Sequence, residues 1–188
     1  DDIYEHLVYG VEFTTLLNVA PDLGERTFIL NGVSKAYAMT GWRIGYLAGP
    51  AEVIKACKKL QSQSTSGACS IAQYASVAAL NSAQEHIEPM RLKFAERAEL
   101  VCAALSEVSG IKSPKTEGAL YVFADVSGAI SDKGLKDDFD FAEWLLESAN
   151  VSVVPGSAFG APGFVRISIA AADADLIEAM RRIKNALE

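Results

Sequence analysis

Apolar residues recur at two different periods along this chain, and the two periods predict its strands and helices. Short apolar runs at 26–32 and 42–50, each followed or closed by glycine, predict two buried strands. Between residues 85 and 108 apolar side chains return at steps of three and four, which predicts a long amphipathic helix. The same reasoning predicts strands at 118–126, 151–156 and 164–170, and helices at 50–61, 70–84, 138–149 and 173–188.

The order of these elements predicts two parts. Residues 1–84 alternate between strands and helices, whereas residues 85–188 form a smaller α+β part, with 85–108 as a bridging helix. The polar segment 127–138 is interpreted as a surface loop. Asp173 stands directly before the last amphipathic run, so we expect it to be the N-cap of the terminal helix.

Composition narrows the class of protein. The 188 residues carry a net charge of −7, and their Lys and Arg are scattered, which disfavours nucleic acid as a partner. No stretch of eighteen apolar residues is present, so no membrane span is expected. Cys57, Cys69 and Cys102 are odd in number and show no metal-binding spacing; we interpret them as small buried residues in a reducing compartment. These features predict a soluble, cytoplasmic protein.

Several familiar chemistries lack a signal. His6 and His86 stand far apart, and neither belongs to a zinc-binding motif, so no metal site is expected. The chain contains no G-x-S-x-G elbow and no phosphate-binding loop of the G-x-x-x-x-G-K type. What remains is Lys35, a basic residue in the turn between the two predicted strands of the first part, with Arg43 as the next positive charge.

The residues around this lysine carry a family resemblance. The stretch 32–45, GVSKAYAMTGWRIG, resembles the pyridoxal-phosphate attachment signature of class I aminotransferases of fold type I. The segments QSTSGACSIAQ, EGALYVF and PGSAFG are similar to those of bacterial aspartate aminotransferases. The resemblance covers essentially the whole chain, but only the C-terminal portion of the family's length.

The resemblance implies a fold and a reaction. Residues 1–84 would be the C-terminal part of the α/β large domain, with its mixed sheet, and residues 85–188 the small α+β domain. The reaction would be ping-pong transfer of an amino group from L-aspartate, or a related amino acid, to 2-oxoglutarate, with pyridoxal 5'-phosphate as cofactor. The whole protein would be a homodimer. This chain is expected to be a fragment incomplete for catalysis, with weak or no activity alone.

The resemblance also assigns roles near the lysine. Lys35 would form a Schiff base with the cofactor and move a proton during the reaction. Arg43 and Ser34 would bind the cofactor phosphate, because a guanidinium fork and a hydroxyl donate hydrogen bonds to phosphate oxygens.

The first residues match a second family pattern, D-x-x-Y. Asp1 would pair with the pyridine nitrogen of the cofactor, and Tyr4 would bind the oxygen on its ring. Asp2 remains an alternative to Asp1 through a shift of one residue.

Arg166 is a charge inside the otherwise apolar run 164–170, and burial of an unpaired charge is costly, so a partner is expected. The resemblance implies that Arg166 binds the substrate α-carboxylate. An internal salt bridge with an acidic residue is the open alternative.

Two other functions stay open. The same signature occurs with lyase or synthase chemistry on this fold, and a non-catalytic, aminotransferase-like regulator domain would also carry it. The choice among aspartate, prephenate and aromatic substrates rests on the resemblance alone.

Overall fold

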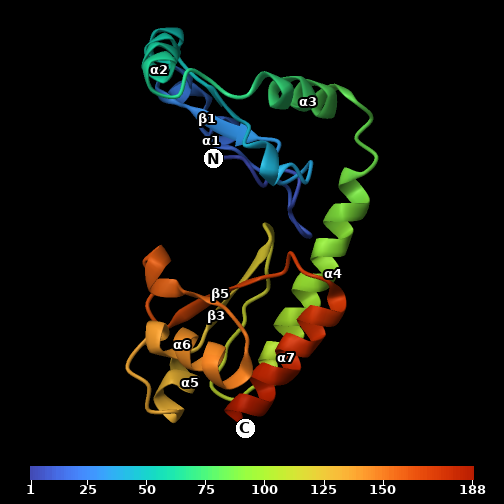
Figure 1. Cartoon of the computed structure of the whole chain (residues 1–188), viewed down its shortest axis with the longest axis vertical. Helices are drawn as coiled ribbons and strands as arrows, with labels where there is room; N and C mark the ends of the chain where they lie inside the picture. The colour runs from blue at the N-terminus through green and yellow to red at the C-terminus, as the bar shows by residue number, and fades with distance from the viewer. The chain divides into compact units, whose positions relative to one another are not determined.

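A computed structural model describes all residues, 1–188, and divides them into two compact units, Asp1–Met90 and Arg91–Glu188 (Figure 1). The division that the sequence predicted, after residue 84, lies a few residues before this boundary. Helix α4, Ile87–Ser106, begins just before the boundary between the units and continues into the second. We describe each unit separately.

The first unit is built on a hairpin. Strands β1, Ile29–Gly32, and β2, Gly45–Ala48, pair antiparallel, so that Asn31 lies opposite Tyr46. The pairing requires glycine at position 32, because a Cβ there would lie 2.8 Å from the carbonyl oxygen of Ile44. The remaining elements are α1, Leu16–Val19; η1, Pro21–Arg26; η2, Thr40–Trp42; α2, Ala51–Ser64; and α3, Ser70–Asn81.

Much of this unit is exposed, which corrects two expectations. Both predicted strands exist, but all four residues of β2 are exposed and α2 has no buried residue. The run 42–50 therefore does not mark a buried strand, and the run 26–32 marks a strand that is only partly buried. The expectation of buried cysteines is also wrong, since Cys57 and Cys69 are exposed and Cys102 is half-buried.

The second unit surrounds a three-stranded sheet. Strand β5, Phe164–Ser168, lies between β3, Tyr121–Asp125, and β4, Val154–Pro155, and both pairings are antiparallel. The helical elements are α5, Ser127–Asp132; α6, Asp138–Ala149; η3, Gly156–Phe159; and α7, Asp173–Leu187. Helices α4 and α7 run side by side (Figure 1), joined by the Lys93–Asp173 and Lys184–Glu107 ion pairs.

The two faces of this sheet differ because side chains alternate along a strand. One face is buried: Val122, Val165 and Ile167 pack toward residues of α4, α6 and α7 such as Phe141 and Ile183. The opposite face carries Tyr121, Phe123, Phe164 and Arg166, all half-buried. The core of the unit therefore lies on the first face, and the single charge of the strand lies on the second.

The helix and loop bounds predicted for the second unit can be compared with the structure. Helix α6 has the predicted bounds, and α7 ends one residue before the predicted end. The predicted loop 127–138 is wrong, since it contains α5 and the start of α6. Ala172, not Asp173, is the N-cap of α7, and the Asp173 carboxylate instead pairs with basic residues of α4.

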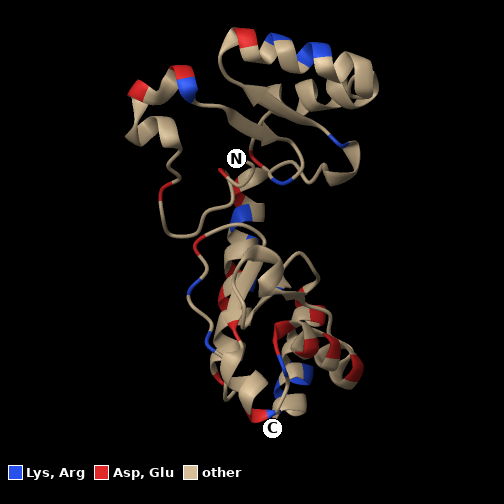
Figure 2. Cartoon of the chain, turned by 90° about the vertical axis from the view of Figure 1, so that its left-hand side faces the viewer, with Lys and Arg blue, Asp and Glu red and all other residues tan.

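The predicted α/β fold class is confirmed in that helices and strands occur in both units, but the expected mixed sheet is not found in this chain, because both sheets are antiparallel throughout. Figure 2 shows Lys and Arg interspersed with Asp and Glu in both units. None of the helices is both long and apolar enough to cross a lipid bilayer.

Candidate functional site

Lys35 lies in the loop that leaves β1. Val33 and Ala36 on either side of it are buried and anchor the loop, while Lys35 itself is half-buried. The loop turns back through a hydrogen bond from the Ala38 amide to the Lys35 carbonyl, and Ala38 is left-handed with φ of 51°. The Lys35 amine lies 5.8 Å from the centroid of the Tyr4 ring. The fold thus brings together two residues that are 31 positions apart in the sequence, 4 and 35.

Arg43 follows the short helix η2 and is also left-handed, with φ of 56°. A non-glycine residue in this region is uncommon, and here it turns the chain into β2. The guanidinium Nη1 donates a hydrogen bond of 2.9 Å to the Thr40 carbonyl, and the residue remains exposed. Its side chain is therefore held at one end without an acidic partner within 4.0 Å.

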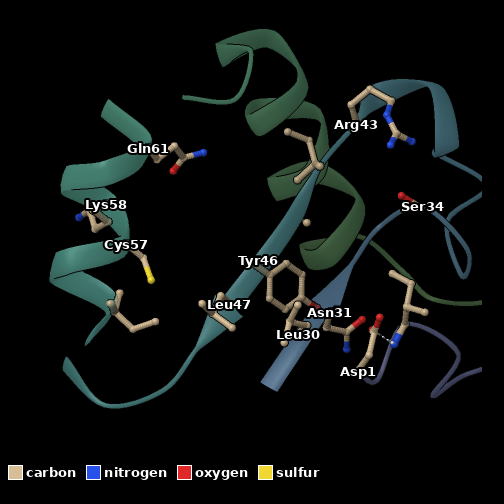
Figure 3. A pocket seen from close by; sticks show the side chains of 14 residues that line it. Asp1, Leu30, Asn31, Ser34, Arg43, Tyr46, Leu47, Cys57, Lys58 and Gln61 are labelled. Atoms are coloured by element: carbon tan, nitrogen blue, oxygen red, sulfur yellow. Dashed lines mark hydrogen bonds between the residues drawn. The ribbon is translucent and has the colours of Figure 1, made fainter. Parts of the chain in front are cut away.

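A cavity of about 730 Å³ lies in the first unit, between the hairpin and α2 (Figure 3). Its size falls within the range of small-molecule sites, about 300–1,000 Å³. Asp1, Ser34 and Arg43 line it, with Tyr46 from β2 and Lys58 from α2. Lys35 is not one of the lining residues; it follows Ser34, which is.

The structure distinguishes Asp1 from Asp2, which the sequence left as alternatives for the same role. Asp1 lines the cavity and accepts a hydrogen bond from the Ile3 amide, drawn as a dashed line in Figure 3. The Asp2 carboxylate instead accepts a 2.9 Å hydrogen bond from the Thr15 hydroxyl. The Asp1 side chain is 64% exposed and that of Asp2 15%. Asp1 is therefore the carboxylate that faces the cavity.

Sequence reasoning missed the contribution of α2. Ile54, Cys57, Lys58 and Gln61 all line the cavity, and their spacing of three and four residues places them on one face of the helix. The sequence predicted this helix but gave no indication of what its face contacts. Val53 and Leu60 of the same helix do not line the cavity. Those two side chains are exposed.

Two tyrosines of the first unit, Tyr37 and Tyr46, have a raised pKa. Burial and the charge of Glu5 raise the pKa of Tyr37, and the same two causes, with a further contribution from Tyr37, raise the pKa of Tyr46. Glu5 is held in place by Asn31, whose side-chain amide donates a 2.7 Å hydrogen bond to its carboxylate. Both phenols are therefore protonated donors at neutral pH.

Arg166 belongs to the second unit and has no ion-pair partner. Its guanidinium carbon lies 4.2 Å from the centroid of the Tyr121 ring and 4.4 Å from that of Phe159. Cation–π contacts of this kind stabilise a charge in place without neutralising it. No acidic residue of the chain lies within ion-pair distance of Arg166, so the internal salt bridge is not formed.

The donors of the first unit fit pyridoxal phosphate. The cofactor needs cationic and hydroxyl donors for its phosphate, an anion for its protonated ring nitrogen, and a primary amine for attachment. Arg43, Ser34 and Asp1 share one cavity, and the Lys35 amine belongs to the residue next to Ser34. The chemistry of this set is the basis for the assignment below.

The sequence profile of the aminotransferase class I and II family matches residues 1–183, so the chain belongs to this family. Pyridoxal phosphate is the cofactor of these transferases, which confirms the cofactor class predicted from the sequence.

Named relatives agree with this membership. The chain is 49% identical to the aspartate aminotransferase of Rhizobium meliloti, over 100% of the chain and 47% of the relative. It is 52% identical to the aspartate/prephenate aminotransferase of Cereibacter sphaeroides, over 98% of the chain and 48% of the relative. The chain thus spans about half the length of the relatives it matches.

Solved structures give the same picture. The crystal structure of the Rhizobium meliloti aspartate aminotransferase superposes with a TM-score of 0.93 at 49% identity, over 100% of this chain and 48% of the other. An aromatic aminotransferase from Pyrococcus horikoshii superposes with a TM-score of 0.90 at 38% identity, over 100% and 50%. These matches do not support the C-terminal placement expected from the sequence, which stays a prediction.

Proposed function

We propose that this chain is part of a pyridoxal-phosphate-dependent transaminase that transfers the amino group of L-aspartate, or a related amino acid, to 2-oxoglutarate by a ping-pong mechanism. The observation that carries the proposal is the neighbourhood of Lys35: the residue before it, Ser34, lines a cavity together with the Asp1 carboxylate and the Arg43 guanidinium, and its amine lies 5.8 Å from the Tyr4 ring. The relatives named as aspartate or aspartate/prephenate aminotransferases support the substrate class.

The bound cofactor supplies a protonated pyridine ring that takes up the electrons released when the substrate Cα loses its proton. Arg43 and Ser34 would hold its phosphate, with the guanidinium as a bidentate donor. The Asp1 carboxylate would face the ring nitrogen and keep it protonated, because an opposite charge nearby favours the charged form. Tyr4, whose ring lies beside the Lys35 amine, would donate to the ring oxygen.

Lys35 has two roles in this proposal. Its Nζ would be the covalent attachment point of the cofactor, and the same Nζ would accept the proton from the substrate Cα. The loop supports both roles, because the buried Val33 and Ala36 fix the backbone while the side chain stays partly accessible.

Arg166 would bind the α-carboxylate of the substrate. Its charge is not neutralised within the chain, and the two aromatic rings leave its N–H groups for a ligand. A carboxylate is the natural complement of a planar fork of donors.

The finer expectations are part of the same proposal. Residues 1–84 would belong to the C-terminal part of a fold type I large domain and 85–188 to the small domain, with α4 bridging them. The active protein would be a cytoplasmic homodimer, and this chain alone would have weak or no activity. Coverage of about half of each relative is consistent with an incomplete catalytic unit.

Chemical trapping tests the attachment point. The chain is incubated with pyridoxal phosphate, reduced with borohydride, digested and mapped by mass spectrometry. We expect the label on Lys35 and its loss in Lys35→Ala. Lys58→Ala is the matched control, because Lys58 lines the same cavity; this variant should keep the label. A label on Lys58, or an unchanged amount of label in Lys35→Ala, would refute the assignment.

Product analysis tests the reaction. In a chimaera, this chain replaces its matching segment of the Rhizobium meliloti aspartate aminotransferase, and the enzyme receives L-aspartate and 2-oxoglutarate. We expect glutamate and oxaloacetate in equal amounts. Ammonia without glutamate would end the transaminase proposal and favour a lyase.

A further inference from the structure

A buried carboxylate lies behind the turn that touches Arg166. Asp138 is 1% exposed at the start of α6, and its carboxylate accepts three hydrogen bonds from outside its own helix. Two come from Ser157 in η3, from the amide at 2.8 Å and from the hydroxyl at 2.7 Å. The third comes from the Gly163 amide at 3.3 Å. A single side chain therefore holds η3 and the start of β5 against α6.

These hydrogen bonds decide the charge of Asp138. Burial disfavours the charged form, but the donors of Ser157 and Gly163 outweigh it, so the pKa of Asp138 lies below its usual value. The group is thus a carboxylate at neutral pH. A buried, fully bonded carboxylate is a rigid attachment, because each donor it holds would otherwise be left unsatisfied.

The turn itself has little freedom. Gly156 packs so closely against the Ala161 carbonyl and Phe164 that a Cβ there would overlap both. Gly160 closes the turn in the left-handed region, with φ of 75°. The position of Phe159 between these two glycines is therefore set by backbone packing on one side and by Asp138 on the other.

Phe159 connects this rigid turn to Arg166 by a direct contact. Its ring centroid is 4.4 Å from the guanidinium carbon and meets the Phe123 ring edge to face at 6.2 Å. Phe123 stacks in turn on Phe164, 5.2 Å away, and lies directly opposite Arg166 in the sheet. An arginine side chain has many rotamers, and these aromatic contacts restrict them on the open face of the sheet.

We propose that Asp138 is a positioning residue: through Ser157 it fixes η3, so that Phe159 holds the Arg166 guanidinium in the orientation that binds the substrate α-carboxylate. The proposal rests on the role of Arg166 given under the proposed function. It adds a reason for the burial of an acid that is not part of an ion pair, since no basic residue forms one with Asp138. Asp138 and Phe159 thereby become determinants of substrate affinity although only Arg166 touches the substrate.

The first part of the test needs no substrate. NMR relaxation of the Arg166 Nε–H group is measured in the 188-residue chain. Asp138→Asn and Phe159→Leu should both make this group markedly more mobile, whereas Phe159→Tyr, which keeps the ring, should preserve its order. Asp125→Asn is the matched control, since Asp125 also accepts from the amide and hydroxyl of one serine, Ser127, but has no bond to η3.

The second part measures kinetics in the chimaera with the Rhizobium meliloti enzyme. Asp138→Asn and Phe159→Leu should each raise KM for L-aspartate about tenfold, which is about 1.4 kcal/mol of binding, with kcat within about twofold. Borohydride labelling at Lys35 should not change, and Asp125→Asn should leave KM unaltered.

The outcomes distinguish the positioning role of Asp138 and Phe159 from the proposed carboxylate-binding role of Arg166. If Arg166→Ala leaves KM unchanged, the carboxylate role of Arg166 fails. If Arg166→Ala raises KM but the Asp138 and Phe159 variants change neither KM nor the mobility of Arg166, the positioning role fails alone. Equal losses of kcat and labelling in Asp138→Asn would mean a structural role; should that variant not fold, Phe159→Leu against Phe159→Tyr decides.

Discussion

The substitution Arg166→Ala separates recognition of the substrate from stability of the fold. Arg166 has no ion pair to lose, so its removal leaves no orphaned internal acid, a loss that costs about 3–5 kcal/mol when a buried pair is broken. What is lost within the chain is the pair of contacts with Tyr121 and Phe159. At about 0.5–1 kcal/mol each, they amount to about 1–2 kcal/mol of unfolding free energy.

The effect on the reaction should be larger. Hydrogen bonds to a charged partner contribute about 1.5–3 kcal/mol each, and a bidentate contact has two. Because 1.4 kcal/mol is a factor of about ten, kcat/KM for L-aspartate should fall about 10²- to 10⁴-fold, chiefly through KM.

The assay is steady-state formation of oxaloacetate by the chimaera, run beside urea denaturation of the same variant. Borohydride labelling at Lys35 is the internal control, because Arg166 should not affect cofactor attachment. A kcat/KM within about threefold of the parent would refute the carboxylate role. A loss of unfolding free energy above about 3 kcal/mol would refute the absence of an internal partner.

Other predictions concern the second unit. Phe141→Ala removes a ring that is 1% exposed and should lower the free energy of unfolding by about 3–5 kcal/mol in urea denaturation, whereas Phe139→Ala, at a position 56% exposed, should change it by less than about 0.5 kcal/mol. The depressed pKa of Asp138 means that the stabilisation from its ionised form is present above its unfolded pKa of about 3.9 and is lost as pH falls through the lower folded value; the difference in stability between the parent and Asp138→Asn should therefore shrink in acid. Asp173→Asn weakens two partly exposed ion pairs with α4 and should lower the free energy of unfolding only slightly, and by less at high salt than at low salt.

Local patterns predicted the second unit well where they were strong. The bounds of α6 were predicted from the residue pattern at 138–149, and in the structure the helix begins after Asp137, whose carboxylate accepts from the Phe139 and Asp140 amides. The pattern failed for α5, whose residues are mostly small and polar and show no period. Its Gly128 packs directly on the backbone of Gly110, a contact between distant segments that no local rule reveals.

For the candidate site, the sequence identified residue types but not their neighbours. The spacing of Lys35 and Arg43 and the D-x-x-Y pattern pointed to the chemistry, and these assignments stay predictions until the label is mapped. The sequence could not distinguish Asp1 from Asp2, because either spacing was possible. The hydrogen bond from Thr15 to Asp2 and the cavity wall at Asp1 distinguish them in the folded chain.

The sequence by itself determined family membership, the cofactor class and the strong helices, because a continuous motif and a helical period are local properties of the chain. Tertiary structure alone decided that the Arg166 charge meets aromatic rings instead of an acid, and that Asp138 bonds a turn 19 residues away. Such contacts depend on which strands and turns become neighbours when the core closes. Pairing between distant residues is a consequence of packing, and no local pattern encodes it.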